Sequence, residues 1–458
     1  MGTQTTTAFK NGLLLVLLVF ATTARAEVTA EEAARLGAAL TPFGAKRAGN
    51  AEGTIPAWTG GITEAPAGYD PGERHPDPFA DDQVLFEITA ANAREHAEHL
   101  SAGQLAMLAA YPETWKLNVY PTHRSASYPH WVYEAVIDNA TSAKVVLEGK
   151  GGVEGARVGP PFPIPKSGVE AIWNHNLRWA GVRITVNEGR TAVTKAGNYT
   201  LIQSVLELGV PYGSREETAF TRRYPNVMFA IKSKIFAPAL LSGNGSLVIE
   251  TIDQTDDPRK AWSYSRAFRR VLRNPYVAYD FPAPESDGLR TVDDSFLFVG
   301  PPDRFEWKLH GKREIFVPYN AYRLHSGDVQ PHDILQRRHI APGLARYELH
   351  RVWMLEAVKK KDAKHLYSRR IFYLDEDSWR VILAESYDHE GKLWRVNEAH
   401  TVNHYEVPAL LSTLTAWHDL AERRYTVGGL DNQRNPPRFR EGGDPREFNP
   451  NALQYYVR

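Results

Sequence analysis

The segment from residue 346 to residue 396 decides the fold of this chain. Three apolar segments alternate there with polar breaks: Ile371-Phe372-Tyr373-Leu374, Asp375-Glu376-Asp377-Ser378, Trp379 to Ala384, Tyr387-Asp388-His389-Glu390-Gly391 and Leu393-Trp394-Arg395-Val396. Strands at such short intervals have to pair antiparallel, because a parallel return needs a crossover of about a dozen residues or more. The segment therefore predicts an antiparallel meander, whose aromatic side chains pack against a helix, a second sheet or a ligand.

Apolar residues recur with period two over a longer region before this meander. On residues 227–237 this period places Phe229, Ile231 and Ile235 on one face. Gly243-Asn244-Gly245 is typical of a hairpin turn. We expect strands over residues 200–208, 227–237, 247–253, 260–264, 296–298, 305–309, 314–317 and 347–358.

The N-terminal part of the chain has a different pattern. Helices are expected over residues 29–40, 89–110, 131–146 and 170–179, with Thr29 and Ser101 as caps. Residues 41–78 are rich in Gly, Pro and Ala around Trp58, and they are too long for an ordinary connection. They predict an extended arm that wraps the body or closes a cavity. The last forty residues predict a tail that wraps the surface.

The first 26 residues have the pattern of a signal peptide. Lys10 precedes the apolar run 12–21, and Ala24-Arg25-Ala26 has the small-x-small form of a cleavage site. We expect cleavage after Ala26 and a soluble protein in the periplasm of a Gram-negative bacterium. The chain contains no cysteine, so no lipid anchor on a cysteine is expected. The predicted parts are a signal peptide (1–26), an arm with helices (27–150) and a curved antiparallel sheet domain with its tail (151–458).

Composition and motifs argue against several function classes. Lys+Arg and Asp+Glu both number 54, so no basic excess favours nucleic acid as a partner. There is no Gly-x-Ser-x-Gly elbow, phosphate loop or dinucleotide motif. The pairs His332-Asp333 and His418-Asp419 are adjacent residues that point to opposite faces of a strand. We therefore expect a protein that is not an enzyme, with no catalytic residue and no cofactor.

One run of metal-ligand residue types leaves two interpretations open. Glu398, His400, His404 and Glu406 are evenly spaced and could converge on one face as zinc ligands. With 16 His in the chain, such a run also arises by chance on a solvated edge strand. The second interpretation is favoured, so no metal is expected.

The candidate ligand-binding residues are aromatic, apolar or polar residues of the predicted helices and strands. Trp173-Asn174-His175 with Arg178 follow the rigid proline run 161–165, either as a helix packed by its tryptophans or as the lining of a cavity mouth. The strand residues form either a filled core or the concave face of a curved sheet. The full set is Trp58, Trp173, Asn174, His175, Arg178, Phe229, Ile231, Ile235, Trp262, Tyr264, Trp307 and Trp353.

Several long motifs resemble the DUF1329 family of exported bacterial proteins. They are residues 40–50 (Leu-Thr-Pro-Phe-Gly-Ala-Lys-Arg-Ala-Gly-Asn), 53–61, 77–82, 120–125 and 161–166 through Trp173-Asn174-His175. The later half is also similar to outer-membrane lipoprotein-sorting (LolA/LolB-like) proteins, through Trp262-Ser263-Tyr264 with Arg269-Arg270-Val271 and through the hairpins around Tyr373 and Tyr387. The family has no agreed catalytic residues, so none is carried over.

The resemblance implies an α+β fold: a large curved antiparallel sheet, or half-open β-barrel, with helices covering the concave face and an extended N-terminal arm. It also implies a lipid or other hydrophobic small molecule as ligand, an RND-type transporter and an outer-membrane protein as partners, and transient membrane contact. The leading hypothesis is a non-catalytic periplasmic binding and transfer protein. The alternatives are an assembly partner of an envelope transport complex, whose slot is filled by its own arm, and a hydrolase of envelope lipid or glycan.

Overall fold

The period-two segments of the sequence form one large sheet. The computed structural model describes residues 27–274 and 278–457 together with Gly2, and the predicted signal peptide lies outside this range. The strands of the large sheet are β1 (Phe86–Ile88), β2 (Leu117–Val119), β5 (Arg183–Val193), β6 (Ile202–Gly209), β7 (Val227–Ala237), β8 (Gly245–Thr251), β9 (Lys260–Ser265), β10 (Arg270–Arg273), β11 (Phe305–Pro318), β12 (Tyr347–Lys359), β13 (Arg369–Asp375), β14 (Val381–Tyr387), β15 (Leu393–His404), β16 (Ala409–Asp419), β17 (Arg424–Leu430) and β18 (Arg438–Arg440).

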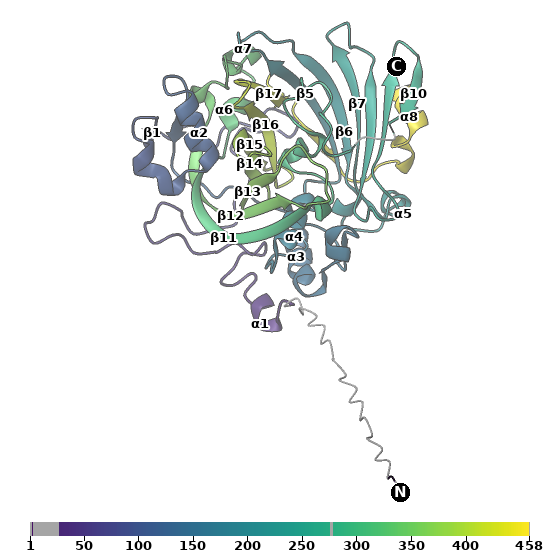
Figure 1. Cartoon of the computed structure of the whole chain (residues 1–458), viewed down its shortest axis with the longest axis horizontal. Coiled ribbons are helices and arrows are strands. Elements are labelled where there is room, and N and C mark those ends of the chain that lie inside the picture. Colours follow the sequence, from purple (N-terminus) through teal and green to yellow (C-terminus); the bar gives the residue numbers. More distant parts are fainter. Residues whose placement is uncertain (1, 3–26, 275–277, 458) are drawn as a thin grey trace.

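The sheet is open, and nearly all of its strands are antiparallel. Its order is β1-β2-β12-β13-β14-β15-β16-β17-β5-β6-β7-β8-β9-β10, with β11 on β12 and β18 on β5. β2 and β12 form a parallel contact at Tyr347 and Val119. The predicted meander is confirmed as β13, β14 and β15. Pairing of β17 with β5 joins the C-terminal meander to the earlier strands, and the sheet curves between these two halves (Figure 1).

Helices lie on both faces of this sheet. α2 (Ala102–Ala110) lies on one face, where Gly103 approaches Glu385 and Val396. α4 (Gly168–Asn176) lies on the other face, where Gly168 approaches Trp307 and Leu355. α3 (His130–Ser142) packs in the same core cluster as α4. The remaining helices are α1 (Ala30–Ala33), α5 (Ala219–Arg223), α6 (Tyr322–His325), α7 (Pro331–Ile334) and α8 (Pro450–Tyr456), and β3 (Lys144–Val145) and β4 (Val153–Glu154) form a small separate sheet.

The 3-10 helix η4 (Val292–Leu297) lies on the α4 side of the sheet. Arg370 of β13 is fully buried and pairs with Asp293 at 2.9 Å and with Asp294 at 2.7 Å. Trp417 of β16 donates its indole N–H to the carbonyl of Asp294 at 3.1 Å. η4 is therefore fixed over β13 and β16, and it faces β5 to β7 across the curve of the sheet.

The C-terminal helix α8 covers the opposite face of β7 to β9. Leu453 and Val457 pack in one cluster with Ala230, Leu247 and Tyr264. The side chains of β7 that alternate with Ala230, such as Phe229 and Ile231, therefore point to the α4 side. One face of β7 is therefore covered by α8, and the opposite face lines a cavity.

Several secondary-structure predictions differ from the structure. The helix predicted over 131–146 ends at Ser142, and Lys144–Val145 form β3. The strand predicted over 296–298 is wrong, because the Thr291 cap forms η4 and Phe296 and Leu297 adopt φ values of 55° and 69°. The helix predicted over 29–40 ends at Ala33. The predicted strands 305–309 and 314–317 are one strand, β11, with an irregularity at Gly311. Part of the predicted tail is β17, which pairs with β16 and β5 inside the sheet.

Candidate ligand-binding cavity

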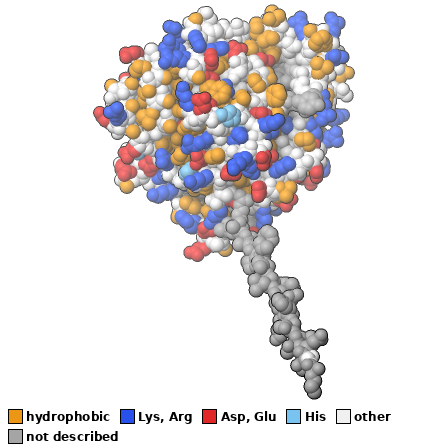
Figure 2. All heavy atoms as spheres, viewed as in Figure 1, with side chains coloured by type: hydrophobic (Ala, Val, Ile, Leu, Met, Phe, Trp, Pro, Cys, Tyr) orange, Lys and Arg blue, Asp and Glu red, His pale blue; other side chains and the backbone are white. Residues whose placement is uncertain are grey.

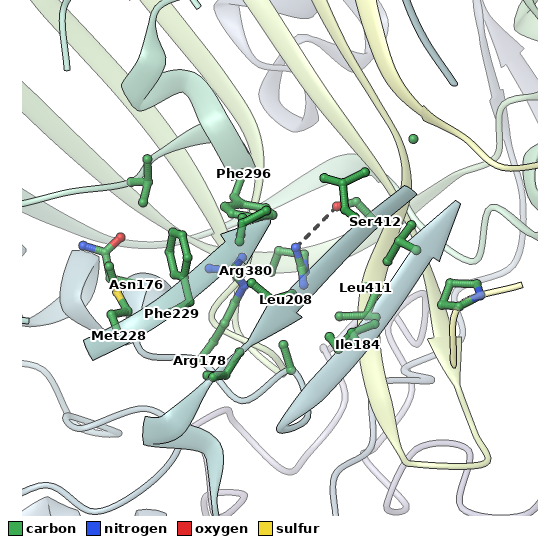
Figure 3. A pocket seen from close by; sticks show the side chains of 18 of the residues that line it. Asn176, Arg178, Ile184, Leu208, Met228, Phe229, Phe296, Arg380, Leu411 and Ser412 are labelled. Atoms are coloured by element: carbon green, nitrogen blue, oxygen red, sulfur yellow. Dashed lines mark hydrogen bonds between the residues drawn. The ribbon is translucent and has the colours of Figure 1, made fainter. Parts of the chain in front are cut away.

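A cavity of about 200 Å³ lies between β5 to β7, β16 and η4. Ile184, Leu208 and Ile231 are direct cross-strand neighbours, so they form an apolar row on one wall. Phe229 and Phe296 meet edge to face at 5.8 Å between ring centroids, and Phe296 is 37% exposed at the mouth. Figure 3 shows Ile184, Leu208, Phe229 and Phe296 around a central space, with Leu411 contributed by β16. The lining is therefore mostly apolar and comes from elements far apart in the sequence.

Two arginines are the main polar feature of this lining. Arg178 follows α4, and Arg380 follows the turn between β13 and β14. Arg380 is 3% exposed, and it donates to the carbonyl of Leu410 at 2.9 Å and to Ser412 Oγ at 3.4 Å. Arg178 donates to the carbonyl of His175, and its guanidinium lies over the ring of Phe296 at 5.5 Å. The Nε atom of each arginine is buried without a partner among the described residues.

The pKa values of both arginines are lowered from that of an ordinary guanidinium. Burial lowers the pKa of Arg380 to about 10. Burial also lowers the pKa of Arg178 well below its usual value, and the neighbouring positive charge of Arg380 lowers it further. Both pKa shifts arise mainly from burial, because a positive charge here lacks the water that would stabilise it, and the negative charge of Asp375 offsets only part of the shift of Arg380.

His175 sets the position of these arginines without entering the cavity wall. Its Nδ1 accepts from the backbone N–H of Val381 at 3.0 Å, and its Nε2–H donates to the carbonyl of Phe298 at 3.1 Å. Burial and the nearby positive charges of Arg178 and Arg380 lower the pKa of His175 well below its usual value. The neutral imidazole therefore connects α4 to β14 and to the segment after η4.

The predicted arm reaches residues of the cavity lining through Arg74, which pairs with Asp431 at 3.2 Å, and through His75. His404 and Asp431 are part of the cavity lining. His75 Nε2 lies 2.8 Å from Glu406 Oε2, and His75 Nδ1 lies 3.1 Å from Nε2 of His325, whose Nδ1 is 2.9 Å from Asp431 Oδ2. His75 is buried, so this row of groups anchors residues 74–76 of the arm to the body.

The interpretation of residues 398–406 as a solvated edge strand is wrong. β15 lies between β14 and β16, and both His400 and His404 are buried. Glu398 accepts from the hydroxyl of Tyr347 at 3.1 Å and lies 4.0 Å from His400, and neither residue belongs to the group formed by His404 and Glu406. Burial lowers the pKa of His404 to about 4.

His75, His404 and Glu406 do offer three ligand atoms within 4.8 Å of one another. The geometry is compatible with a cation. Because His75 and Glu406 already pair with each other, the group is also complete as a structural anchor. The expectation of no metal stays a prediction.

Three of the predicted ligand-binding residues line this cavity: Arg178, Phe229 and Ile231. Ile235, Trp262 and Tyr264 border a second cavity of about 460 Å³, which also contains Arg190, Glu285 and Arg290. Trp262 pairs across the sheet with Leu247 on the α8 side, so its ring does not share a face with Phe229. A role in ligand binding stays a prediction for each of these residues.

The other predicted residues lie in packed regions. Trp173 belongs to a core cluster with Phe162 and Leu177, and Asn174 makes two hydrogen bonds of 2.7 Å with the backbone of Phe162. Trp307 stacks on Phe372, and Trp353 stacks on Trp379. Trp58 packs edge to face on Tyr133 beneath Arg47. These tryptophans, with Asn174 and His175, are not among the residues that line either cavity.

Sequence reasoning missed Arg380, Phe296 and Leu411 as lining residues. Arg380 carried a detectable signal, because it is a charged residue inside the apolar run from Trp379 to Ala384. Phe296 carried none, because its position depends on the turn that Thr291 and Asp294 form. Leu411 depends on the register of β15 and β16, which shifts between His400 and Thr401.

Comparisons with known proteins settle the family. Residues 87–454 match the family described as "Protein of unknown function (DUF1329)". The chain belongs to the DUF1329 family. The uncharacterized protein PA3922 of Pseudomonas aeruginosa is 41% identical over 444 residues, which cover 96% of each chain.

Solved structures show more distant similarity. A domain described as an outer membrane lipoprotein-sorting protein domain from Vibrio parahaemolyticus has 15% identity and a TM-score of 0.43, covering 63% of this chain and 98% of that one. A DUF1329 family protein from Desulfovibrio piger has 14% identity and a TM-score of 0.41, covering 60% and 92%. A LolA superfamily protein from Nitrosomonas europaea has 11% identity and a TM-score of 0.36, covering 62% and 97%.

The surface agrees with the balanced composition of the chain. Basic and acidic side chains are mixed with apolar ones across the face in Figure 2. Within residues 27–274 and 278–457, no helix has the length and apolar character needed to cross a membrane.

Proposed function

We propose that this protein is a carrier that binds the apolar part of a lipid-like small molecule in the cavity between β5 to β7, β16 and η4. The observation that carries the proposal is the apolar cross-strand row of Ile184, Leu208 and Ile231, which faces open space instead of packed side chains. Water in such a space makes poor contacts, whereas an apolar chain is stabilised there by about 25 cal/mol per Å² of area removed from water. Burial of roughly 200 Å² of ligand would contribute roughly 5 kcal/mol.

The arrangement supports a half-open barrel with its lid formed by η4 and α4. Phe296 at the mouth contacts Phe229 inside, so a change in the Phe296 side-chain conformation would open or close the entrance while η4 stays fixed over the sheet. The arm does not take the place of a ligand: the lining residues of this cavity belong to residues 176–437, and none of the described arm residues is among them. This argues against an assembly partner whose slot is filled by its own arm.

The place of action and the partners are part of the same proposal. The signal peptide predicted over residues 1–26 supports the periplasm as the place of action. A carrier of apolar molecules there would exchange its ligand with an RND-type transporter and an outer-membrane protein, without catalysis and without a cofactor.

Binding of a neutral apolar fluorophore tests the proposal. N-phenyl-1-naphthylamine should bind the purified protein saturably with a stoichiometry near one to one. Phe229→Asp should abolish binding, because it places a charge on the apolar wall. Phe236→Asp is the matched control, since Phe236 lies on the same strand but is exposed and lines neither cavity. Equal binding by both variants would reject this cavity as the site.

A further inference from the structure

The apolar cavity is lined by two arginines that form no ion pair with any described residue. Among residues 27–274 and 278–457, neither Arg178 nor Arg380 has a carboxylate within ion-pair distance. Each guanidinium carries five N–H donors. Arg380 donates to Leu410 and Ser412, Arg178 donates to the carbonyl of His175, and the Nε atom of each has no partner.

The other buried arginines of the described chain differ from Arg380 in this respect. Each of them forms an ion pair with at least one carboxylate: Arg124, Arg183, Arg346, Arg351, Arg370 and Arg395. A buried charge without a partner is strongly unfavourable, and folded proteins tolerate it where a ligand supplies the opposite charge. Arg380 is therefore the exception among the buried arginines of the described chain, because its only side-chain partners are the Leu410 carbonyl and the Ser412 hydroxyl.

The two carboxylates that line the cavity are already paired elsewhere. Glu188 accepts from Arg190 at 3.2 Å. Asp431 lies 2.9 Å from His325 Nδ1 and 3.2 Å from Arg74. Neither is left to neutralise Arg178 or Arg380, so the excess of positive charge faces the cavity (Figure 3).

We infer that the ligand is an amphiphile with an anionic head group, carboxylate or phosphate, which binds between Arg178 and Arg380 while its tail lies along Ile184, Leu208 and Ile231. The inference rests on the proposed function, because it places the head group in the same cavity. Guanidinium groups suit such a ligand, since their planar donors match carboxylate and phosphate oxygens in paired hydrogen bonds. Phe296, which lies over Arg178, would cover the head group from the mouth.

The test compares four probes with the same twelve-carbon tail and different heads: dodecanoate, dodecyl phosphate, dodecanol and dodecylamine. Each displaces N-phenyl-1-naphthylamine from the purified protein at pH 7.5. One or more charge-assisted hydrogen bonds should make an anionic probe bind at least about tenfold more tightly than dodecanol. Dodecylamine should bind more weakly than dodecanol. The comparison of dodecanoate with dodecyl phosphate distinguishes the two head groups.

Variants assign the preference to the arginines. Arg380→Gln should reduce the ratio of dodecanol to dodecanoate Kd to about twofold or less while the Kd of dodecanol stays unchanged. Arg178→Gln should lower the ratio independently, and Arg380→Lys should keep part of it because it keeps the charge. Arg222→Gln, an exposed arginine of α5, should change nothing.

The outcomes separate the two proposals. Binding of all four probes with equal Kd overturns the head-group inference and leaves the carrier proposal standing. Binding of none of the probes, dodecanol included, overturns the carrier proposal itself. An anion preference that persists in both glutamine variants overturns the assignment to Arg178 and Arg380.

Discussion

Replacing Arg380 with methionine should leave the ligand-free protein as stable as the wild type or slightly more stable. This is unusual for a buried arginine. Removing one partner of a buried ion pair typically destabilises a protein by about 3–5 kcal/mol. Arg380→Met removes a charge that has no such partner, and the methionine keeps most of the apolar contacts.

The expected change in the free energy of unfolding of Arg380→Met is the sum of two opposing contributions. Burial lowers the pKa of Arg380 from 12.5 to about 10, and a shift of this size corresponds to roughly 3 kcal/mol against the charged form at pH 7. Against this, the variant loses the hydrogen bond to the Leu410 carbonyl and the long one to Ser412, worth about 1 kcal/mol for the first and less for the second. The free energy of unfolding should therefore change by less than about 2 kcal/mol.

Arg370→Met is the matched control for this experiment. Arg370 is also buried, but it pairs with Asp293 and Asp294 and fixes η4. Its loss leaves the buried carboxylate of Asp294 without an ion pair and that of Asp293 with His365 alone, so it should destabilise the protein by about 3–5 kcal/mol. Urea or guanidinium denaturation of both variants at pH 7 measures the difference. If Arg380→Met lost as much stability as Arg370→Met, Arg380 would have an internal counterion, and the reasoning would be refuted.

Three further predictions concern the core, the arm and the cavity. Burial lowers the pKa of His418 from 6.5 to about 3, so the unfolded state takes up this proton first as pH falls. Between pH 6.5 and pH 3, protonation of His418 in the unfolded state therefore lowers the free energy of unfolding by up to about 1.4 kcal/mol for each pH unit. His418→Gln should flatten the pH dependence measured by denaturation, and an unchanged curve would contradict this. His75→Ala should release residues 74–76 and speed proteolysis within the arm without altering fluorophore binding; equal cleavage rates would show that the anchor is unimportant. Trp58→Asp should leave the fluorophore Kd unchanged, because Trp58 packs on Tyr133 away from the cavity, and a large loss of binding would assign the arm to the site.

The sequence predicted the meander because its signals are local. Each strand of residues 369–404 has its own apolar period, and each turn has its own polar residues, so the antiparallel order follows from short connections. The same logic predicted β7 with its observed bounds, Val227–Ala237. The joining of β17 to β5 was not predictable, because no local signal couples residues more than two hundred positions apart.

The cavity was predicted only in part for the same reason. Phe229 and Ile231 could be placed on one face from alternation alone. Whether other side chains cover that face depends on the position of η4. The ion pairs of Arg370 with Asp293 and Asp294 fix this position, and they join residues far apart in the sequence. That Arg380 has no ion-pair partner likewise depends on packing across the fold. The sequence shows only that a charged residue lies within an apolar run.

The most direct test of the central claim is native mass spectrometry of the protein purified from the envelope of its own host, followed by lipid analysis of the bound material. The account predicts a stoichiometric adduct of an acyl-chain-like molecule with an acidic head group, absent from the Phe229→Asp variant. A ligand-free mass that stays unchanged after incubation with envelope lipids would contradict it.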